Sequence, residues 1–270
     1  MGSADKFGAR TPAGFERHEY VINGIRTIVN VGGAGQPVLY FHGAGNWHGI
    51  DFVSGWLDRL QIIAPSHPGF GESDDAPAEM SSISDYVLHY LELMEMMGLK
   101  QVGLLGISMG GWMAAEFALA YRHLVRKLVL VAPAGLNDPD YPTPPGVGRW
   151  TLQEMYGFLV EDQASVGRHL PSTPEEHAAH ASQVAREARS TFKLLTPGVP
   201  YPPRLERWMH RITMPTLLAW SKADRLTPVG RHKKWMRLLP NAQLLLVERG
   251  GHLTLDESAE VRDAVVRFLS

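Results

Sequence analysis

The sequence of 270 residues contains no cysteine. That absence excludes disulfide bonds, cysteine nucleophiles and metal sites built on thiolates. It is also compatible with a reducing compartment, and we therefore expect a cytoplasmic protein.

The chain also lacks long apolar runs and a strong charge of either sign. No stretch approaches the roughly 18 apolar residues of a membrane span, and residues 1–12 lack the apolar core of a signal peptide. The formal net charge of −2 gives no reason to expect nucleic acid or an anionic membrane as a partner. We therefore expect a small-molecule substrate, and nothing in the sequence indicates a homo-oligomer.

Short apolar segments alternate with amphipathic ones along most of the chain. Strands are predicted at 17–22, 25–31, 36–41, 61–64, 102–105, 127–132, 216–220 and 243–247. Helices are predicted at 50–59, 83–97, 112–120, 229–239 and 257–269. Strands that alternate with helices favour an α/β fold with a mostly parallel, doubly wound sheet and helices on both faces.

One long segment, from residue 133 to about residue 209, breaks this alternation. It opens with prolines and glycines and then contains helix-forming stretches at 151–159, 162–169 and 174–195. Loops of more than about 15 residues without structure are uncommon in compact domains, so we predict a helical insertion here. The residues on either side, 1–132 and 210–270, are predicted to form one α/β core.

The clearest chemical signal is Gly106-Ile107-Ser108-Met109-Gly110, which matches the pattern G-x-S-x-G. A predicted strand precedes the motif and a predicted helix follows it, as in the sharp turn that lifts a nucleophilic serine above a sheet. Glycines on both sides of Ser108 allow the strand and the helix to pass close to each other. Ser108 is therefore predicted to be a catalytic nucleophile rather than an ordinary turn serine.

A serine nucleophile needs a base that takes its proton and an acid that orients the base. His252 follows the last predicted strand, and Asp224 follows the strand before it. With Ser108 they lie at the carboxyl ends of strands, where open α/β sheets build their sites. The chain order of serine, aspartate and histidine is that of the α/β-hydrolase fold. Asp138 and Asp140 also follow a strand and remain alternatives for Asp224.

The negative charge that develops on an attacked carbonyl oxygen needs hydrogen-bond donors that are already in place. The backbone N–H of Met109, next to the serine, is predicted to be one donor. The second is predicted at Ala44, in the His42-Gly43-Ala44-Gly45 loop after the strand at 36–41. His42 is expected to brace this loop through hydrogen bonds, and Trp47 is expected to contact the substrate.

Taken together, these motifs resemble those of the α/β-hydrolase superfamily, over about residues 17–268. The 42–45 segment resembles its oxyanion loop, and His67-Pro68-Gly69-Phe70-Gly71-Glu72-Ser73 resembles the segment after its fourth strand. The resemblance implies that Ser108, Asp224 and His252 are a catalytic triad. It also implies that 133–209 is a cap, or lid, over the site. Within the superfamily, the chain is similar to small carboxylesterases and to carbon–carbon hydrolases of meta-cleavage pathways.

The sequence departs from these relatives at three points. Ser66 stands where many of them carry aspartate, and Ile107 replaces a polar residue that is frequent before the serine. Asn46-Trp47-His48 is not the Pro-Gly continuation of many carbon–carbon hydrolases. These departures leave the three predicted catalytic residues in place, but they weaken any assignment of the substrate.

Two further groups of residues are interpreted as solvated helix faces. His177 and His180 have a spacing that can bind a metal, but no third ligand accompanies them. Arg186, Arg189 and Lys193 also share one face of a predicted helix.

The sequence therefore predicts a serine hydrolase that cleaves a small, fairly apolar ester through an acyl-enzyme, with no cofactor and no metal. The alternative with the same triad is a carbon–carbon hydrolase that acts on a vinylogous diketone acid of the meta-cleavage-product type. A third hypothesis, from a different class, is a ligand-binding receptor on the same fold.

Overall fold

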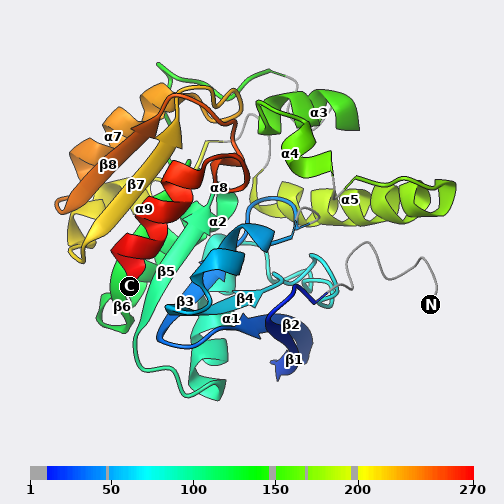
Figure 1. The fold of residues 1–270 in the computed structure, drawn as a ribbon. Helices are drawn as coiled ribbons and strands as arrows, with labels where there is room; N and C mark the ends of the chain where they lie inside the picture. Colours follow the sequence, from blue (N-terminus) through cyan, green and yellow to red (C-terminus); the bar gives the residue numbers. More distant parts are fainter. Residues whose placement is uncertain (1–10, 47–48, 146–149, 168–169, 196–199) are drawn as a thin grey trace.

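The computed structural model describes residues 11–46, 49–145, 150–167, 170–195 and 200–270 (Figure 1). At its centre is a sheet of the strands β1 (Phe15–Ile22), β2 (Ile25–Gly32), β3 (Gln36–Phe41), β4 (Leu60–Pro65), β5 (Val102–Ile107), β6 (Val125–Val131), β7 (Thr216–Ser221) and β8 (Ala242–Val247). Their order across the sheet is β1-β2-β4-β3-β5-β6-β7-β8. β2 pairs antiparallel with β1 and β4, whereas all pairs from β4 to β8 are parallel. The mostly parallel sheet that the sequence predicts is confirmed.

Helices cover both faces of this sheet, as Figure 1 shows. The core helices are α1 (Ile83–Met96), α2 (Met109–Ala120), α7 (His232–Leu238), α8 (Thr254–Glu257) and α9 (Ala259–Leu269). Alternate side chains of a strand point to opposite faces, so Leu39 and Phe41 of β3 join one buried cluster while Val38 and Tyr40 join the other. α1 and α2 pack in the first cluster, and α9 packs in the second. β5 and β7 are buried along their whole length, because both faces of the sheet are covered there.

Some element boundaries differ from the prediction. The helix predicted at 50–59 is a 3-10 helix at Asp51–Trp56. The helix predicted at 257–269 begins instead at Ala259, because Ser258 Oγ accepts the backbone N–H of Val261 at 3.3 Å and caps α9. α2 begins at Met109, earlier than predicted, so that the helix starts directly after Ser108.

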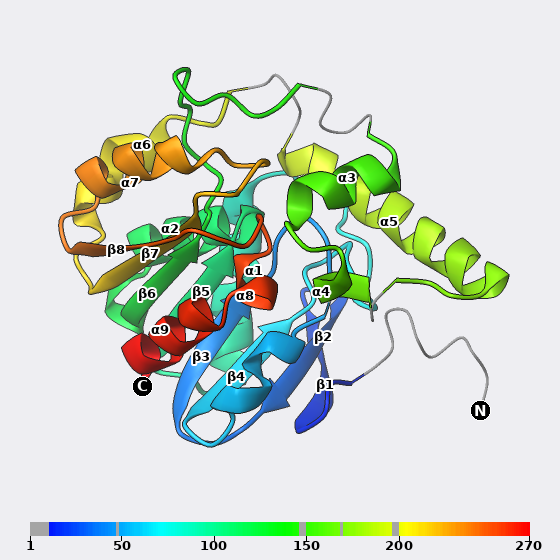
Figure 2. The same cartoon turned by 45° about the horizontal axis from the view of Figure 1, so that its top comes forward.

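The segment 133–209 contains α3 (Leu152–Leu159), α4 (Ala164–Gly167), α5 (Pro174–Leu194) and α6 (Arg204–Trp208). Figures 1 and 2 show α3, α4 and α5, in green to yellow-green, gathered outside the sheet and apart from α7 and α9. α5 begins with a capping box between Thr173 and Glu176 and with Pro174 in its first turn. α6 is missing from the prediction because a helix of five residues shows no periodicity. Part of the helix predicted at 162–169, residues 168–169, lies outside the described residues.

In the part of the chain that the structure describes, no helix is both long enough and apolar enough to cross a bilayer.

Candidate active site

Ser108 occupies the turn between β5 and α2. Its backbone has φ 55° and ψ −120°, and a positive φ is uncommon for any residue other than glycine. Such a backbone costs about 1–3 kcal/mol and persists only where its surroundings enforce it. Those surroundings require glycine, since a Cβ on Gly106 would clash with the Gly110 carbonyl group and one on Gly110 with the Phe41 carbonyl oxygen. The strand, strained turn and helix that the motif predicts are all present.

Asp224 and His252, from the loops after β7 and β8, meet in the folded chain. His252 Nδ1 lies 2.9 Å from Asp224 Oδ2, and both side chains are buried. Asp224 Oδ1 accepts the backbone N–H groups of Leu226 and Thr227, each at 2.9 Å. Thr227 Oγ1 donates to Asp224 Oδ2 at 2.6 Å. These hydrogen bonds fix the carboxylate, which in turn assigns the proton of a neutral His252 ring to Nδ1.

The other ring nitrogen of His252 is then a proton acceptor. Nε2 is buried, and it has no hydrogen-bond partner among the residues that the structure describes. Thr227, which lies 3.0 Å from His252 Nδ1, lines the same cavity as Ser108. Asp224 and His252 are therefore joined, through Thr227, to the wall of the cavity that Ser108 lines.

The loop after β3 lies directly against Ser108. A Cβ built on Gly43 would lie 3.5 Å from the Ser108 Cβ, and Ala44 lines the cavity beside Ser108. Met109 is the first residue of α2, where backbone N–H groups have no partner within the helix. The structure thus brings the two predicted oxyanion residues, Ala44 and Met109, to the same serine.

Two stacked histidines hold this loop in place. The rings of His42 and His67 have centroids 3.6 Å apart. His42 Nδ1 donates to the carbonyl oxygen of Gly43 at 2.8 Å, and His42 Nε2 accepts the backbone N–H of His67 at 3.0 Å. His67 Nε2 donates to the His42 carbonyl oxygen at 3.0 Å, and its Nδ1 contacts the Tyr90 hydroxyl. Burial lowers the pKa of His67 to about 3, so this ring is neutral and serves as a brace.

Helix α5 ties the loop after β3 to the loop between β4 and α1. The Glu187 side chain is buried, and its Oε2 accepts the backbone N–H of Asn46 at 3.0 Å. Its Oε1 accepts the backbone N–H of Gly71, also at 3.0 Å. Thr191, one turn further along α5, donates its hydroxyl to the carbonyl oxygen of Ala44 at 3.1 Å. α5, a helix of the segment 133–209, is therefore hydrogen-bonded to the predicted oxyanion loop itself.

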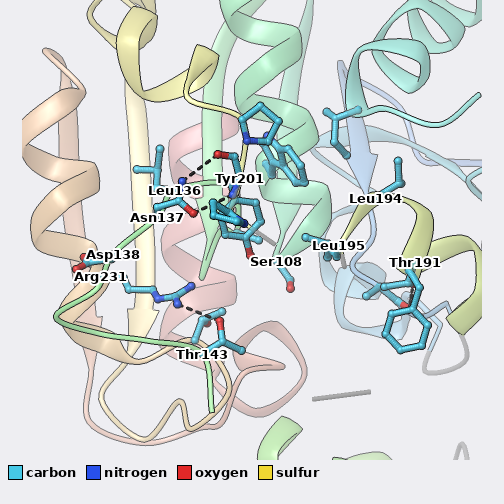
Figure 3. A pocket seen from close by; sticks show the side chains of 18 of the residues that line it. Ser108, Leu136, Asn137, Asp138, Thr143, Thr191, Leu194, Leu195, Tyr201 and Arg231 are labelled. Carbon is cyan, nitrogen blue, oxygen red and sulfur yellow. Dashed lines mark hydrogen bonds between the residues drawn. The ribbon is translucent and has the colours of Figure 1, made fainter. Parts of the chain in front are cut away.

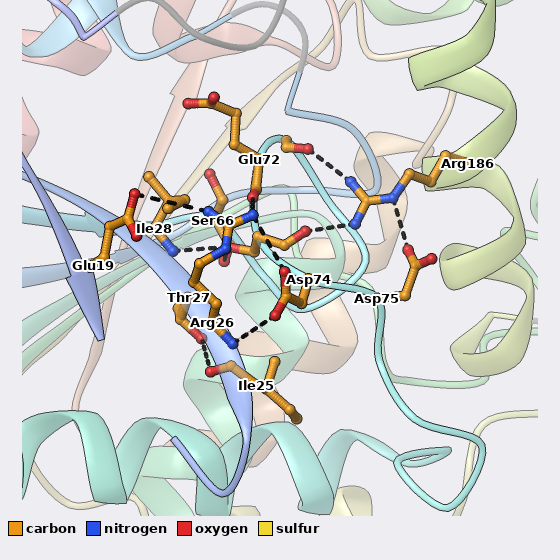
Figure 4. Close-up of polar contacts among 12 residues, drawn as sticks. Glu19, Ile25, Arg26, Thr27, Ile28, Ser66, Glu72, Asp74, Asp75 and Arg186 are labelled. Atoms are coloured by element: carbon orange, nitrogen blue, oxygen red, sulfur yellow. Dashed lines mark hydrogen bonds and ion pairs between the residues drawn. The ribbon is translucent and has the colours of Figure 1, made fainter. Parts of the chain in front are cut away.

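The face of α5 that carries Arg186, Arg189 and Lys193 was expected to be solvated, but it contacts the loop between β4 and α1. Arg186 Nε lies 2.7 Å from Asp75 Oδ1, and its guanidinium donates to the carbonyl oxygens of Gly71 and Ser73 (Figure 4). Lys193 Nζ donates to the carbonyl oxygen of Ala76 at 3.2 Å. The expectation is wrong for Arg186, which is only partly exposed, whereas Arg189 and Lys193 are exposed as expected. Helical spacing shows which residues share a face but not what that face touches.

Ser108 opens into a cavity of about 1040 Å³ (Figure 3). Its walls are mostly apolar and come from the core, from the loop after β6 and from the inserted segment, with Trp112, Leu136, Leu194, Leu195, Pro202 and Leu226 among the lining residues. Charged groups also line it, including Glu116 and Arg204, which form an ion pair of 2.8 Å. A cavity of this size accommodates a small molecule with a mainly apolar body.

The remaining sequence expectations have mixed outcomes. Asp138 lines the cavity but Asp224 is the acid bonded to His252, and Asp140 is exposed. His180 is not on a solvated face, because it is buried and its Nε2 lies 2.8 Å from the Tyr156 hydroxyl. The described residues contain no cluster of three or more metal-ligating side chains. Trp47, the expected substrate contact, lies outside the described residues.

Sequence reasoning missed three residues of the site. Thr227 lies next to Leu226, whose backbone N–H is bonded by Asp224 two positions earlier, and an aspartate that forms such a turn is a signal that the sequence carries. Glu187 lies among the charges of α5, and nothing in the sequence separates it from its exposed neighbours. Arg231 opens into the cavity from the turn before α7, and it carries no motif.

Comparison with known proteins identifies the class. Residues 38–264 match the Alpha/beta hydrolase family, and the chain belongs to that family and is a hydrolase. The chain is 26% identical, over 90% of both sequences, to the 2-hydroxy-6-oxononadienedioate/2-hydroxy-6-oxononatrienedioate hydrolase of Comamonas testosteroni.

Solved structures share the fold. A membrane phospholipase A, described as a bacterial virulence factor, has a TM-score of 0.81 and 22% identity over 95% of this chain and 86% of its own. A meta-cleavage product hydrolase from Pseudomonas fluorescens IP01 has a TM-score of 0.78 and 20% identity over 93% and 96% of the two chains. These similarities confirm the predicted fold, and the family match over residues 38–264 confirms the suspected superfamily.

Proposed function

We propose that the protein is a serine hydrolase that cleaves a small, fairly apolar ester through an acyl-enzyme. Ser108 would be the nucleophile, His252 the general base and acid, and Asp224 the carboxylate that orients His252. The observation that carries the proposal is the strained Ser108 in a cavity to whose wall Thr227 joins the buried Asp224–His252 hydrogen bond of 2.9 Å.

We propose the following course for the reaction. His252 Nε2 takes the Ser108 hydroxyl proton as Oγ attacks the ester carbonyl, and the backbone N–H groups of Met109 and Ala44 hold the resulting oxyanion. The tetrahedral intermediate collapses, the bond to the alcohol oxygen breaks, and His252 returns the proton to that oxygen. A water molecule then attacks the acyl-enzyme, again with His252 as base, and releases the acid and Ser108.

We also propose that residues 133–209 act as a cap over the site. The support is that α5 hydrogen-bonds to the loop of Ala44 and that Leu194 and Leu195 line the cavity. Apolar walls of this kind favour an apolar acyl chain and exclude water from the reacting atoms.

A second candidate function is hydrolysis of a carbon–carbon bond next to a ketone, with the same three residues. It is favoured by the relatives, since the Comamonas testosteroni hydrolase and the Pseudomonas fluorescens hydrolase are named for such oxo-acid or meta-cleavage products. Against it, Ile107 is an apolar side chain with 1% exposure and offers no polar group beside the serine. We therefore place ester hydrolysis first.

The proposal predicts that the wild-type enzyme turns over p-nitrophenyl esters and that Ser108→Ala does not. Initial rates on the acetate, butyrate and octanoate esters should fall with chain length, and a fluorophosphonate probe should label wild type but not Ser108→Ala. The same rates on a vinylogous 1,5-diketone acid separate the two candidates. Fast diketone cleavage with weak ester turnover would favour the second candidate, and labelling of Ser108→Ala would remove Ser108 as nucleophile.

A further inference from the structure

Arg231 is a buried cation at the wall of the cavity. It ends the 3-10 turn Val229–Arg231 before α7, and only 5% of it is exposed. Its Nε donates to the carbonyl oxygen of Tyr141 at 2.7 Å, and its Nη2 donates to Thr143 Oγ1 at 3.0 Å (Figure 3). Its charge also interacts with the side chain of Tyr201. All three partners are uncharged, and they do not use all the N–H donors of a guanidinium.

Arg204, the other arginine that lines this cavity, differs from Arg231 in exposure and in pairing. Arg204 is about half exposed, and its Nη1 lies 2.8 Å from Glu116 Oε2. Arg231, although far more buried, forms no ion pair with any acid in the described part of the chain; Asp138, which also lines the cavity, is not paired with it. Buried charges are normally paired, because their desolvation is costly. The charge of Arg231 therefore lacks the counterion that its burial calls for.

The geometry also supplies the space for that counterion. Arg231, Thr143 and Tyr201 line the same cavity as Ser108, and Figure 3 shows the Arg231 side chain pointing into it. Among the described lining residues, three cations (Lys193, Arg204 and Arg231) face two acids (Glu116 and Asp138), which leaves one positive charge in excess.

We propose that Arg231 binds a carboxylate at the end of the substrate's acyl chain, so that the enzyme acts on half-esters of dicarboxylic acids. The apolar walls would hold the methylene chain, Ser108 would attack the ester at one end, and Arg231 and Tyr201 would hold the carboxylate at the other. A planar guanidinium suits a carboxylate, with which it forms two parallel hydrogen bonds. This inference rests on the proposed ester hydrolysis and names its substrate class.

The test compares two esters that differ in one group. Monomethyl adipate and methyl hexanoate have the same chain, with a carboxylate in one and a methyl group in the other, and their hydrolysis is followed by proton release. Wild type should favour the acid ester in kcat/KM by about tenfold or more, since a hydrogen bond to a charged group is strong. Monomethyl succinate, glutarate, suberate and sebacate, each beside its neutral counterpart, locate the best chain length.

Arg231→Gln should lower kcat/KM for the acid ester by about 10- to 100-fold more than it lowers kcat/KM for the neutral ester. Arg231→Lys, which keeps the charge, should retain part of the preference. The matched control is the double variant Glu116→Gln/Arg204→Gln, which removes a paired arginine from the same cavity without changing its net charge. Its preference should stay within about threefold of wild type.

Two results would overturn the inference. One is a wild-type enzyme that hydrolyses neutral and acid esters equally well at every chain length. The other is an equal loss on both esters in Arg231→Gln, which would make Arg231 a support for the Tyr141–Thr143 loop.

Calorimetric titration with the adipate dianion separates this inference from the proposed function. Adipate binding that is lost in Arg231→Gln, in a protein that hydrolyses no ester, would remove the ester proposal and keep the carboxylate site. Ester hydrolysis without adipate binding, and without a preference for the acid ester, would keep the ester proposal and remove the carboxylate site.

Discussion

The two sides of Ser108 use buried histidines in different ways. On one side, His252 Nδ1 lies 2.9 Å from the carboxylate of Asp224. On the other, His42 stacks on the neutral ring of His67 and hydrogen-bonds to backbone groups of Gly43 and His67. Both histidines are almost completely buried, so burial alone does not distinguish a base from a brace.

The partner makes the difference. A carboxylate stabilises the imidazolium that forms when a base takes a proton, and it fixes the tautomer that leaves Nε2 as the acceptor. Carbonyl oxygens and a neutral ring also fix a tautomer, but they supply no charge to balance a proton. His252 is therefore suited to move protons, whereas His42 and His67 are suited to hold the predicted oxyanion loop still.

The largest expected effect comes from removing the charge on the His252 side. Asp224→Asn keeps the shape of the side chain, but its amide favours the tautomer in which Nε2 carries the proton. We expect kcat on p-nitrophenyl butyrate to fall by about 10³–10⁴. Stopped assays at high enzyme concentration, with Ser108→Ala as the blank, measure a loss of this size.

Asp138→Asn is the matched control, since it neutralises an acid of the same cavity that is not bonded to His252. It should change kcat by no more than about two- to threefold. A mild loss in Asp224→Asn together with a large loss in Asp138→Asn would reverse the assignment of the two acids.

On the brace side, His42→Phe should cost stability more than chemistry. Phenylalanine keeps a flat ring against His67 but leaves the His67 N–H and the Gly43 carbonyl oxygen without their present partner. An unsatisfied buried polar group costs about 1–3 kcal/mol, and we expect the free energy of unfolding to fall by that amount in urea titrations. kcat should fall by roughly tenfold, less than the ~10²–10³ that loss of an oxyanion donor costs. A fall in kcat as large as that of Asp224→Asn would contradict the distinction between base and brace.

Much of the Ser108 region could be predicted from the sequence because its constraints are local. A glycine on each side of the serine, a strand before it and a helix after it are all visible within a short stretch. Asp224 and His252 could be placed because parallel strands bring the loops at their carboxyl ends to one edge of the sheet. The sequence favoured Asp224 over Asp138 by its place in the chain, but it could not show which of the two loops reaches the imidazole.

The inserted segment shows the opposite case. Its longest helix was predicted closely, at 174–195 against Pro174–Leu194 in the structure. The contacts of this helix with the core were not predicted, because Arg186 and Glu187 bind loops more than a hundred residues earlier in the chain. Helical spacing carries no information about such distant partners. The same holds for Arg231, whose burial is decided by how the loop after β6 folds over α7.

The smallest expected effect is on the pH dependence of stability, and it tests whether His67 is neutral. The folded-state pKa of His67 is about 3, whereas an unfolded histidine titrates near 6.5. Between these values the unfolded chain binds a proton that the folded chain does not, so the free energy of unfolding falls as the pH falls. From pH 6 to pH 5 the contribution of His67 to this fall is about 1 kcal/mol. Urea titrations at both pH values should therefore show a smaller fall, by that amount, in His67→Gln than in wild type. An unchanged fall in His67→Gln would mean that the ring beside His42 is not held neutral.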